Sequence, residues 1–221
     1  MVDFKKNFAW DQSIAKYFAQ ILSRIPMHPN VITTVGWILG VFSGYLFAQG
    51  EPYLANYAAA IFIIAAFLDH VDGEFARIVG KTSNFGHYYD HFAVCVTYIS
   101  LFIGIGIGKS YGILGSTAIF FGFTASIAIA TIMSIRLYKE IRDGKLSIQQ
   151  GNFLGFEPED TLYIVGPIAW LGGLTPFLIA AGIGAPILDS QNRAIAAISL
   201  SGTKSTITFR NIPTLAKRVI K

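Results

Sequence analysis

Long apolar runs are the feature of this sequence that most constrains its fold. Five of them are about long enough to cross the hydrocarbon core of a bilayer as helices. They are Val31 to Gln49, Tyr53 to Leu68, Phe92 to Gly108, Gly112 to Ile135 and Leu162 to Ile183. Only 14% of the 221 residues are charged and 53% are hydrophobic, whereas soluble domains carry roughly a quarter charged residues. We therefore expect an all-α, polytopic membrane helix bundle.

The segment before the first span has a different pattern. Within residues 1–28, apolar residues from Trp10 to Ile25 recur at helical spacing, and polar residues such as Lys16 fall between them. This pattern predicts an amphipathic helix lying in the membrane interface. Residues 29–221 are then expected to form one transmembrane domain.

The tail, residues 185–221, leaves the number of spans open at five or six. Charged residues such as Asp189 and Arg193 interrupt a sixth span, and each would cost at least roughly 2.5–3.5 kcal/mol near mid-membrane. With five spans, however, the basic end that includes Lys217 and Arg218 would lie outside. The positive-inside rule favours six.

Basic residues also predict the orientation of the chain. They gather before the first span, after the second and after the fourth, while the opposite loops carry only Lys109. The amino terminus and the loops after the second and fourth spans are therefore expected to be cytoplasmic. This placement accounts for the net charge of +4, and a nucleic-acid partner is not needed to explain it.

The end of the second span carries ionisable residues on one helix face. Asp69, Asp72, Ala76 and Arg77 share this face if the helix continues into the cytoplasm. Such residues can be simple interface anchors. Two acids with a glycine directly behind them, at Gly73, instead favour a cation and a phosphate as joint ligand.

The third span opens with Gly86 and a third carboxylate, Asp90, at about the same membrane depth. Hard divalent cations prefer such oxygen ligands. The two helices could therefore hold a metal ion between them, with Arg77 forking onto a phosphate.

These residues resemble the signature of the CDP-alcohol phosphotransferases, the CDP-alcohol phosphatidyltransferase family. The family pattern is D-x2-D-G-x2-A-R-x8-G-x3-D-x3-D. Seven of its eight positions match, at Asp69, Asp72, Gly73, Ala76, Arg77, Gly86 and Asp90. The resemblance extends over residues 1 to about 184.

The resemblance implies a function and a set of roles. The expected activity is transfer of a phosphoalcohol group from a CDP-alcohol donor to an acceptor alcohol, with release of CMP. Lipid-linked substrates, phospholipid biosynthesis and an active site at the cytoplasmic face of the cell membrane are expected with it. The metal ligands for Mg²⁺ or Mn²⁺ would be Asp69, Asp72 and Asp90, and the nucleotide would contact Gly73, Ala76, Arg77 and Gly86.

The eighth position departs from the pattern, because Val94 stands where the family has a fourth aspartate. The resemblance implies that this aspartate deprotonates the attacking alcohol, and valine can neither bind a metal ion nor accept a proton. His87 shares the helix face of Asp90, and His91 follows it directly. Asp90, His87 and His91 are therefore the candidate catalytic residues, although interfacial or hydrogen-bonding roles are commoner for such histidines.

Two other functions stay open at this point. A catalytically silent member would bind CDP-alcohol and metal without turnover, as Val94 would explain. An ion-coupled transporter would also explain acidic residues in helices, but it is the weaker alternative. Transporters often show repeated halves and binding sites near the bilayer midplane, and neither feature is found in this sequence. Gly36, Gly40 and Gly44 line one face of the first span, and such glycine faces make a homodimer reasonable.

Overall fold

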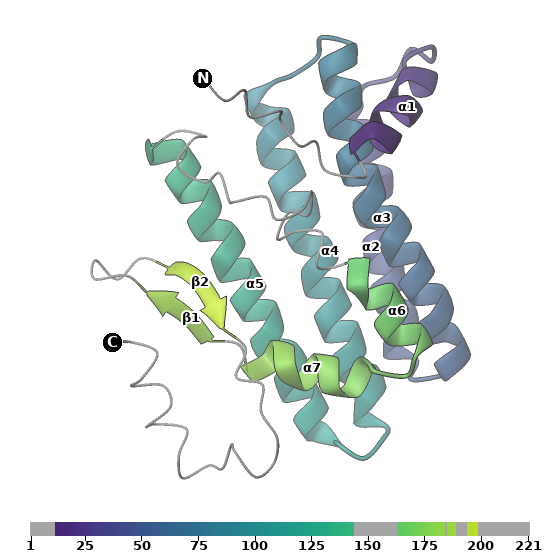
Figure 1. Cartoon of the computed structure of the whole chain (residues 1–221), viewed down its shortest axis with the longest axis vertical. Coiled ribbons are helices and arrows are strands. Elements are labelled where there is room, and N and C mark those ends of the chain that lie inside the picture. The colour runs from purple at the N-terminus through teal and green to yellow at the C-terminus, as the bar shows by residue number, and fades with distance from the viewer. Residues whose placement is uncertain (1–11, 144–162, 184, 189–193, 199–221) are drawn as a thin grey trace, which may run out of the picture.

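The computed structural model describes residues 12–143, 163–183, 185–188 and 194–198 (Figure 1). These residues form the helices α1 (Gln12–Leu22), α2 (Pro29–Ala48), α3 (Pro52–Ile78), α4 (Asn84–Ser110), α5 (Ser116–Asp143), α6 (Val165–Trp170) and α7 (Leu174–Ile183), and the strands β1 (Ala185–Leu188) and β2 (Ala194–Ile198). Helices α2 to α5 are each long and apolar enough to cross a membrane. The predicted membrane helix bundle is therefore confirmed.

Local signals set the starts of α2 and α4, which border the candidate site together with α3. Pro29 opens α2, where a fixed φ suits the first turn and a missing N–H costs nothing. The backbone N–H of Asn30 donates to Nδ1 of His28, 3.2 Å away. At the start of α4, the Ser83 hydroxyl accepts from the backbone N–H of Gly86 at 3.0 Å. These caps define where each helix enters the bundle.

Helices α2 and α4 pack so closely that side chains would not fit between them. A Cβ atom at Gly40 would lie 2.5 Å from Oγ1 of Thr97, and one at Gly44 would collide with the backbone of Ser100. A Cβ atom at Gly36 would meet its neighbours at an ordinary 3.6 Å. The glycine face of α2 is thus used within the chain, so it gives no support to the predicted homodimer.

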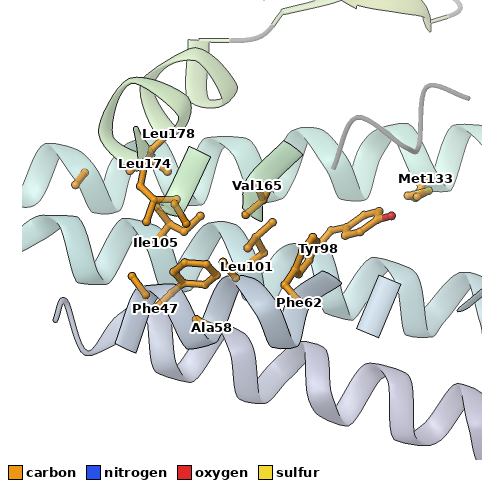
Figure 2. Packing of buried hydrophobic residues seen from close by; sticks show 14 residues of the cluster. Phe47, Ala58, Phe62, Tyr98, Leu101, Ile105, Met133, Val165, Leu174 and Leu178 are labelled. Atoms are coloured by element: carbon orange, nitrogen blue, oxygen red, sulfur yellow. The ribbon is translucent and has the colours of Figure 1, made fainter. Parts of the chain in front are cut away.

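A hydrophobic cluster fills the centre of the bundle (Figure 2). Phe62, Leu101 and Ile105 are fully buried in it, and Val165 of α6 closes one side. The cluster extends toward the candidate site, where Val94 packs against it. The site therefore lies beside the packed core of the bundle.

Helix α1 lies within the predicted interfacial segment and packs against α3. Its buried side consists of small residues, Ala15 and Ala19, and its exposed side carries large apolar ones such as Tyr17 and Phe18. Such a face suits a helix at a membrane surface. The interfacial position stays a prediction, and residues 1–11 lie outside the described part of the chain.

The predicted fifth span, Leu162 to Ile183, is wrong as a single helix. The structure divides it into α6 and α7, of 6 and 10 residues, each shorter than the roughly 20 needed to span a bilayer. The break falls at Gly172, whose φ of +76° lies in the left-handed region that ends a helix. Helix α6 packs against α3, and α7 runs across α5 (Figure 1).

The described part of the tail is not helical. Strands β1 and β2 pair antiparallel, with Ala185 opposite Ile198. These residues therefore contribute no sixth span. The rest of the predicted tail lies outside the described residues.

Candidate metal and nucleotide site

Three carboxylates meet where α3 and α4 approach each other. Asp69 and Asp72 are three residues apart on α3, which places them on one helix face. Asp90 lies in the second turn of α4. One carboxylate oxygen from each residue lies within 4.8 Å of the others. The structure thus brings together the three residues that the sequence predicts as metal ligands.

The donor set fits a hard divalent cation. All three ligands are oxygens, and their separation is within about twice the ~2.0–2.6 Å length of a Mg²⁺–O or Ca²⁺–O bond. Oδ1 of Asp90 is buried and has no hydrogen-bond partner among the residues that the structure describes. Three close carboxylates repel one another, and a cation between them would offset this repulsion. Mg²⁺ or Mn²⁺ would satisfy both the charge and the unpartnered oxygen.

Thr33 of α2 holds one of the carboxylates in place. Its Oγ1 donates a hydrogen bond to Oδ2 of Asp72, and both residues are buried. Sequence reasoning assigned Thr33 no role in the site. The contact joins residues 39 positions apart, so it depends on how α2 packs against α3 and leaves no local signal.

A cavity of about 200 Å³ opens beside Asp72 and Asp90. It is lined by Pro29, Asn30, Thr33, Asp72, Gly73, Ala76, Arg77, Lys81, Thr82, Ser83, Gly86, His87 and Asp90. All four predicted nucleotide contacts are among these residues. Asp69 instead lines a smaller cavity that it shares with Asp72 and Val94.

The two motif glycines differ in what they make room for. Within the described part of the chain, a Cβ atom at Gly73 would meet only the guanidinium of Arg77, at 3.7 Å or more, so the packing of these residues does not require glycine there. A Cβ atom at Gly86 would approach Oγ of Ser83 at 3.2 Å, which is already tight. Gly73 therefore keeps the cavity open for a ligand, while Gly86 also serves the packing of the α4 cap.

Arg77 lies at the wall of the cavity with its side chain 58% exposed. Its Nη2 donates to Oε1 of Glu74 at 2.7 Å, one turn earlier on α3. A guanidinium has five N–H donors in a planar fork. A phosphate in the cavity could therefore bind N–H groups of Arg77 other than the one that contacts Glu74.

The two candidate histidines of α4 contact a residue that sequence reasoning missed. Nε2 of His87 lies 2.9 Å from Oε1 of Glu140, and Nε2 of His91 lies 3.4 Å from Oε2 of the same carboxylate. Glu140 comes from α5 and is buried. Nothing in its local sequence distinguishes it from other charged residues near the end of that helix.

The bundle is that of a membrane protein with a candidate metal site, and the chain belongs to the CDP-alcohol phosphatidyltransferase family, whose model matches residues 26–185. Archaetidylinositol phosphate synthase of Pyrococcus horikoshii is 34% identical over 89 residues, which are 39% of this chain and 45% of that protein. The chain thus spans about half the length of this curated relative.

Two solved structures share the fold. Phosphatidylinositol phosphate synthase of Mycobacterium tuberculosis with CDP-DAG bound superposes with a TM-score of 0.56 at 20% identity, over 76% of this chain and 88% of that one. The same enzyme in complex with manganese and citrate gives a TM-score of 0.53 at 19% identity, over 76% and 83%. At these identities the likeness concerns the fold alone.

Proposed function

We propose that this protein transfers a phosphoalcohol group from a CDP-alcohol donor to an acceptor alcohol and releases CMP. The observation that carries the proposal is the meeting of three carboxylates beside a cavity lined by Gly73, Ala76, Arg77 and Gly86. Oxygen ligands for a cation and an arginine for phosphate are what a diphosphate-linked donor requires.

The residues would act on different parts of the donor. Arg77 would bind the diphosphate through its planar fork, while Gly73 lets the nucleotide approach the backbone of α3. Thr33 would keep Asp72 in position. A divalent cation held by Asp69, Asp72 and Asp90 would neutralise charge on the diphosphate.

The transfer itself forms one bond and breaks another. The acceptor hydroxyl oxygen would attack the phosphorus next to the donor's alcohol in line, and the bond from that phosphorus to CMP would break. CMP leaves with its own phosphate. The hydroxyl proton must pass to a base, for which Asp90, His87 and His91 are the candidates. Val94 offers no group for it.

The substrates and setting are proposed from the relatives. The relative from Pyrococcus horikoshii and the enzyme from Mycobacterium tuberculosis are both named as synthases of a lipid-linked inositol phosphate. A lipid-linked CDP donor and an inositol phosphate acceptor are therefore the first pair to test. Phospholipid biosynthesis with the site at the cytoplasmic face agrees with the basic loops around it.

The test is CMP release by the purified protein in detergent or vesicles. Release that requires a lipid-linked CDP donor, an acceptor and Mg²⁺ or Mn²⁺ would support the proposal. Absence of release with every donor and acceptor, while CDP still binds with metal, would instead support a catalytically silent member. Val94 favours this second function, because it packs against the hydrophobic cluster at the position of the missing carboxylate.

A further inference from the structure

A second cluster of metal-ligating side chains lies where α4 and α5 pack together. It consists of His87 and His91 of α4 and Glu140 of α5, and one ligand atom from each lies within 4.8 Å of the others. Its donors are two ring nitrogens and a carboxylate, whereas the aspartate site offers carboxylates alone. The two clusters therefore differ in the chemistry of the cation that each would prefer.

Helix geometry brings the three side chains of this second cluster together. His87 and His91 are four residues apart, so they share one face of α4. Their ring centroids are 4.7 Å apart and the rings meet at 83°. Glu140 lies in the last turn of α5. Its side chain is 7% exposed, that of His91 18% and that of His87 31%. The cluster is shielded, yet His87 leaves a route from solvent.

Both histidines contact the same carboxylate of Glu140, one through each of its oxygens. Nε2 of His87 is buried and lies at ion-pair distance, 2.9 Å, from Oε1 of Glu140. Nε2 of His91 is 3.4 Å from Oε2, beyond the usual ~2.7–3.2 Å of an N–H···O bond. Two ligands at tetrahedral angles, each ~2.0–2.1 Å from a zinc ion, lie about 3.3 Å apart. Both observed separations are near this value, so the three side chains could share one ion with little movement.

We propose that His87, His91 and Glu140 form a second metal site, which takes a borderline transition-metal ion of the Zn²⁺ class. Imidazole nitrogens suit such ions, whereas Mg²⁺ prefers oxygen ligands. Paired histidines at four-residue spacing on a helix are a recurrent zinc-binding arrangement. Three protein ligands leave a coordination position for water or substrate.

This site does not depend on the proposed transfer, because it uses different ligands from the aspartate cluster. It does change the role of the histidines. An ion bound there occupies the lone pairs of His87 and His91, so neither could accept the acceptor's proton while the ion is bound.

The test measures zinc directly in chelator-stripped, detergent-purified protein. The protein is dialysed against limiting Zn²⁺ in an excess of Mg²⁺, which occupies the aspartates, and its metal content is determined by mass spectrometry. The variants are His91→Gln and Glu140→Gln, with His70→Gln as a matched control outside both clusters and Asp69→Asn to remove the oxygen site. Melting temperatures of the stripped proteins check that each variant is folded.

We expect about one zinc ion per wild-type chain, and the same content in His70→Gln and Asp69→Asn. In His91→Gln and Glu140→Gln the zinc affinity should fall by more than the ~10–100-fold that loss of an outer-shell partner costs. Zinc should also raise the melting temperature of the wild type and not of these two variants. Wild type without zinc, unchanged zinc in both variants, or loss of zinc in Asp69→Asn would overturn the proposal. Failure of the transfer would appear in CMP release and leave the zinc content unchanged.

Discussion

Replacing Val94 by aspartate should raise the rate of CMP release. Position 94 lies one turn beyond Asp90 on α4, and Val94 lines the small cavity that Asp69 and Asp72 also line. A carboxylate there would therefore face the metal-binding cluster and could take the proton of the acceptor hydroxyl. A positioned general base is worth about 10²–10⁴ in rate, or roughly 2.7–5.4 kcal/mol of barrier at 1.36 kcal/mol per tenfold.

The same substitution should make stability depend on metal. Val94 packs against the hydrophobic cluster, and an uncompensated carboxylate in such a place costs several kcal/mol. It would also add a fourth negative charge beside three that already repel one another. We expect Val94→Asp to melt below wild type in EDTA and to recover more than wild type does when Mg²⁺ is added.

The assay is initial-rate CMP release with a saturating lipid-linked CDP donor and acceptor. Val94→Asn is the matched control, because its side chain has nearly the same shape but cannot accept the proton. The reasoning requires Val94→Asp to exceed both wild type and Val94→Asn. If wild type is already as fast as Val94→Asp, another residue supplies the base and the geometric argument fails.

Three further substitutions test other parts of the structure. Arg77→Lys should weaken CDP binding in calorimetry by about tenfold, the worth of one charge-assisted hydrogen bond; equal affinities would reduce Arg77 to an interface anchor. Thr33→Val keeps the side-chain shape but removes the hydrogen bond to Asp72. It should therefore lower the affinity for Mg²⁺, measured through Mg²⁺-dependent CDP binding. An unchanged Mg²⁺ affinity would show that Asp72 does not need this hydrogen bond. Gly44→Ala should lower the free energy of unfolding by about 1–3 kcal/mol, because the new Cβ meets the backbone of α4. Gly36→Ala, whose Cβ has room, is its control in the same denaturation assay, and equal losses for both would contradict the packing argument.

The sequence predicted that Asp69, Asp72 and Asp90 come together, because two local rules were enough. Helical periodicity placed Asp69 and Asp72 on one face, and a short turn after the second span returned Asp90 to the same depth. Both rules concern neighbouring positions along the chain. Neither rule depends on how distant helices pack.

The parts that the sequence did not reveal depend on tertiary packing or on one backbone angle. Thr33 reaches Asp72 across 39 positions, and Glu140 reaches His91 across 49. Neither residue belongs to the motif. The apolar run from Leu162 to Ile183 has the composition of a span, but hydropathy averages over the left-handed Gly172 that divides it.

The central claim is that the three carboxylates bind CDP-alcohol through a shared divalent cation. The most direct measurement is calorimetric titration of CDP into wild type and Asp69→Asn, in Mg²⁺ and in EDTA. Asp69 belongs to the carboxylate cluster but does not line the nucleotide cavity, so its loss should act through the cation alone. We predict that wild type binds CDP more tightly in Mg²⁺ than in EDTA and that Asp69→Asn shows the same weak binding in both. Equal CDP affinity of wild type with and without Mg²⁺, or full Mg²⁺ dependence in Asp69→Asn, would contradict the account.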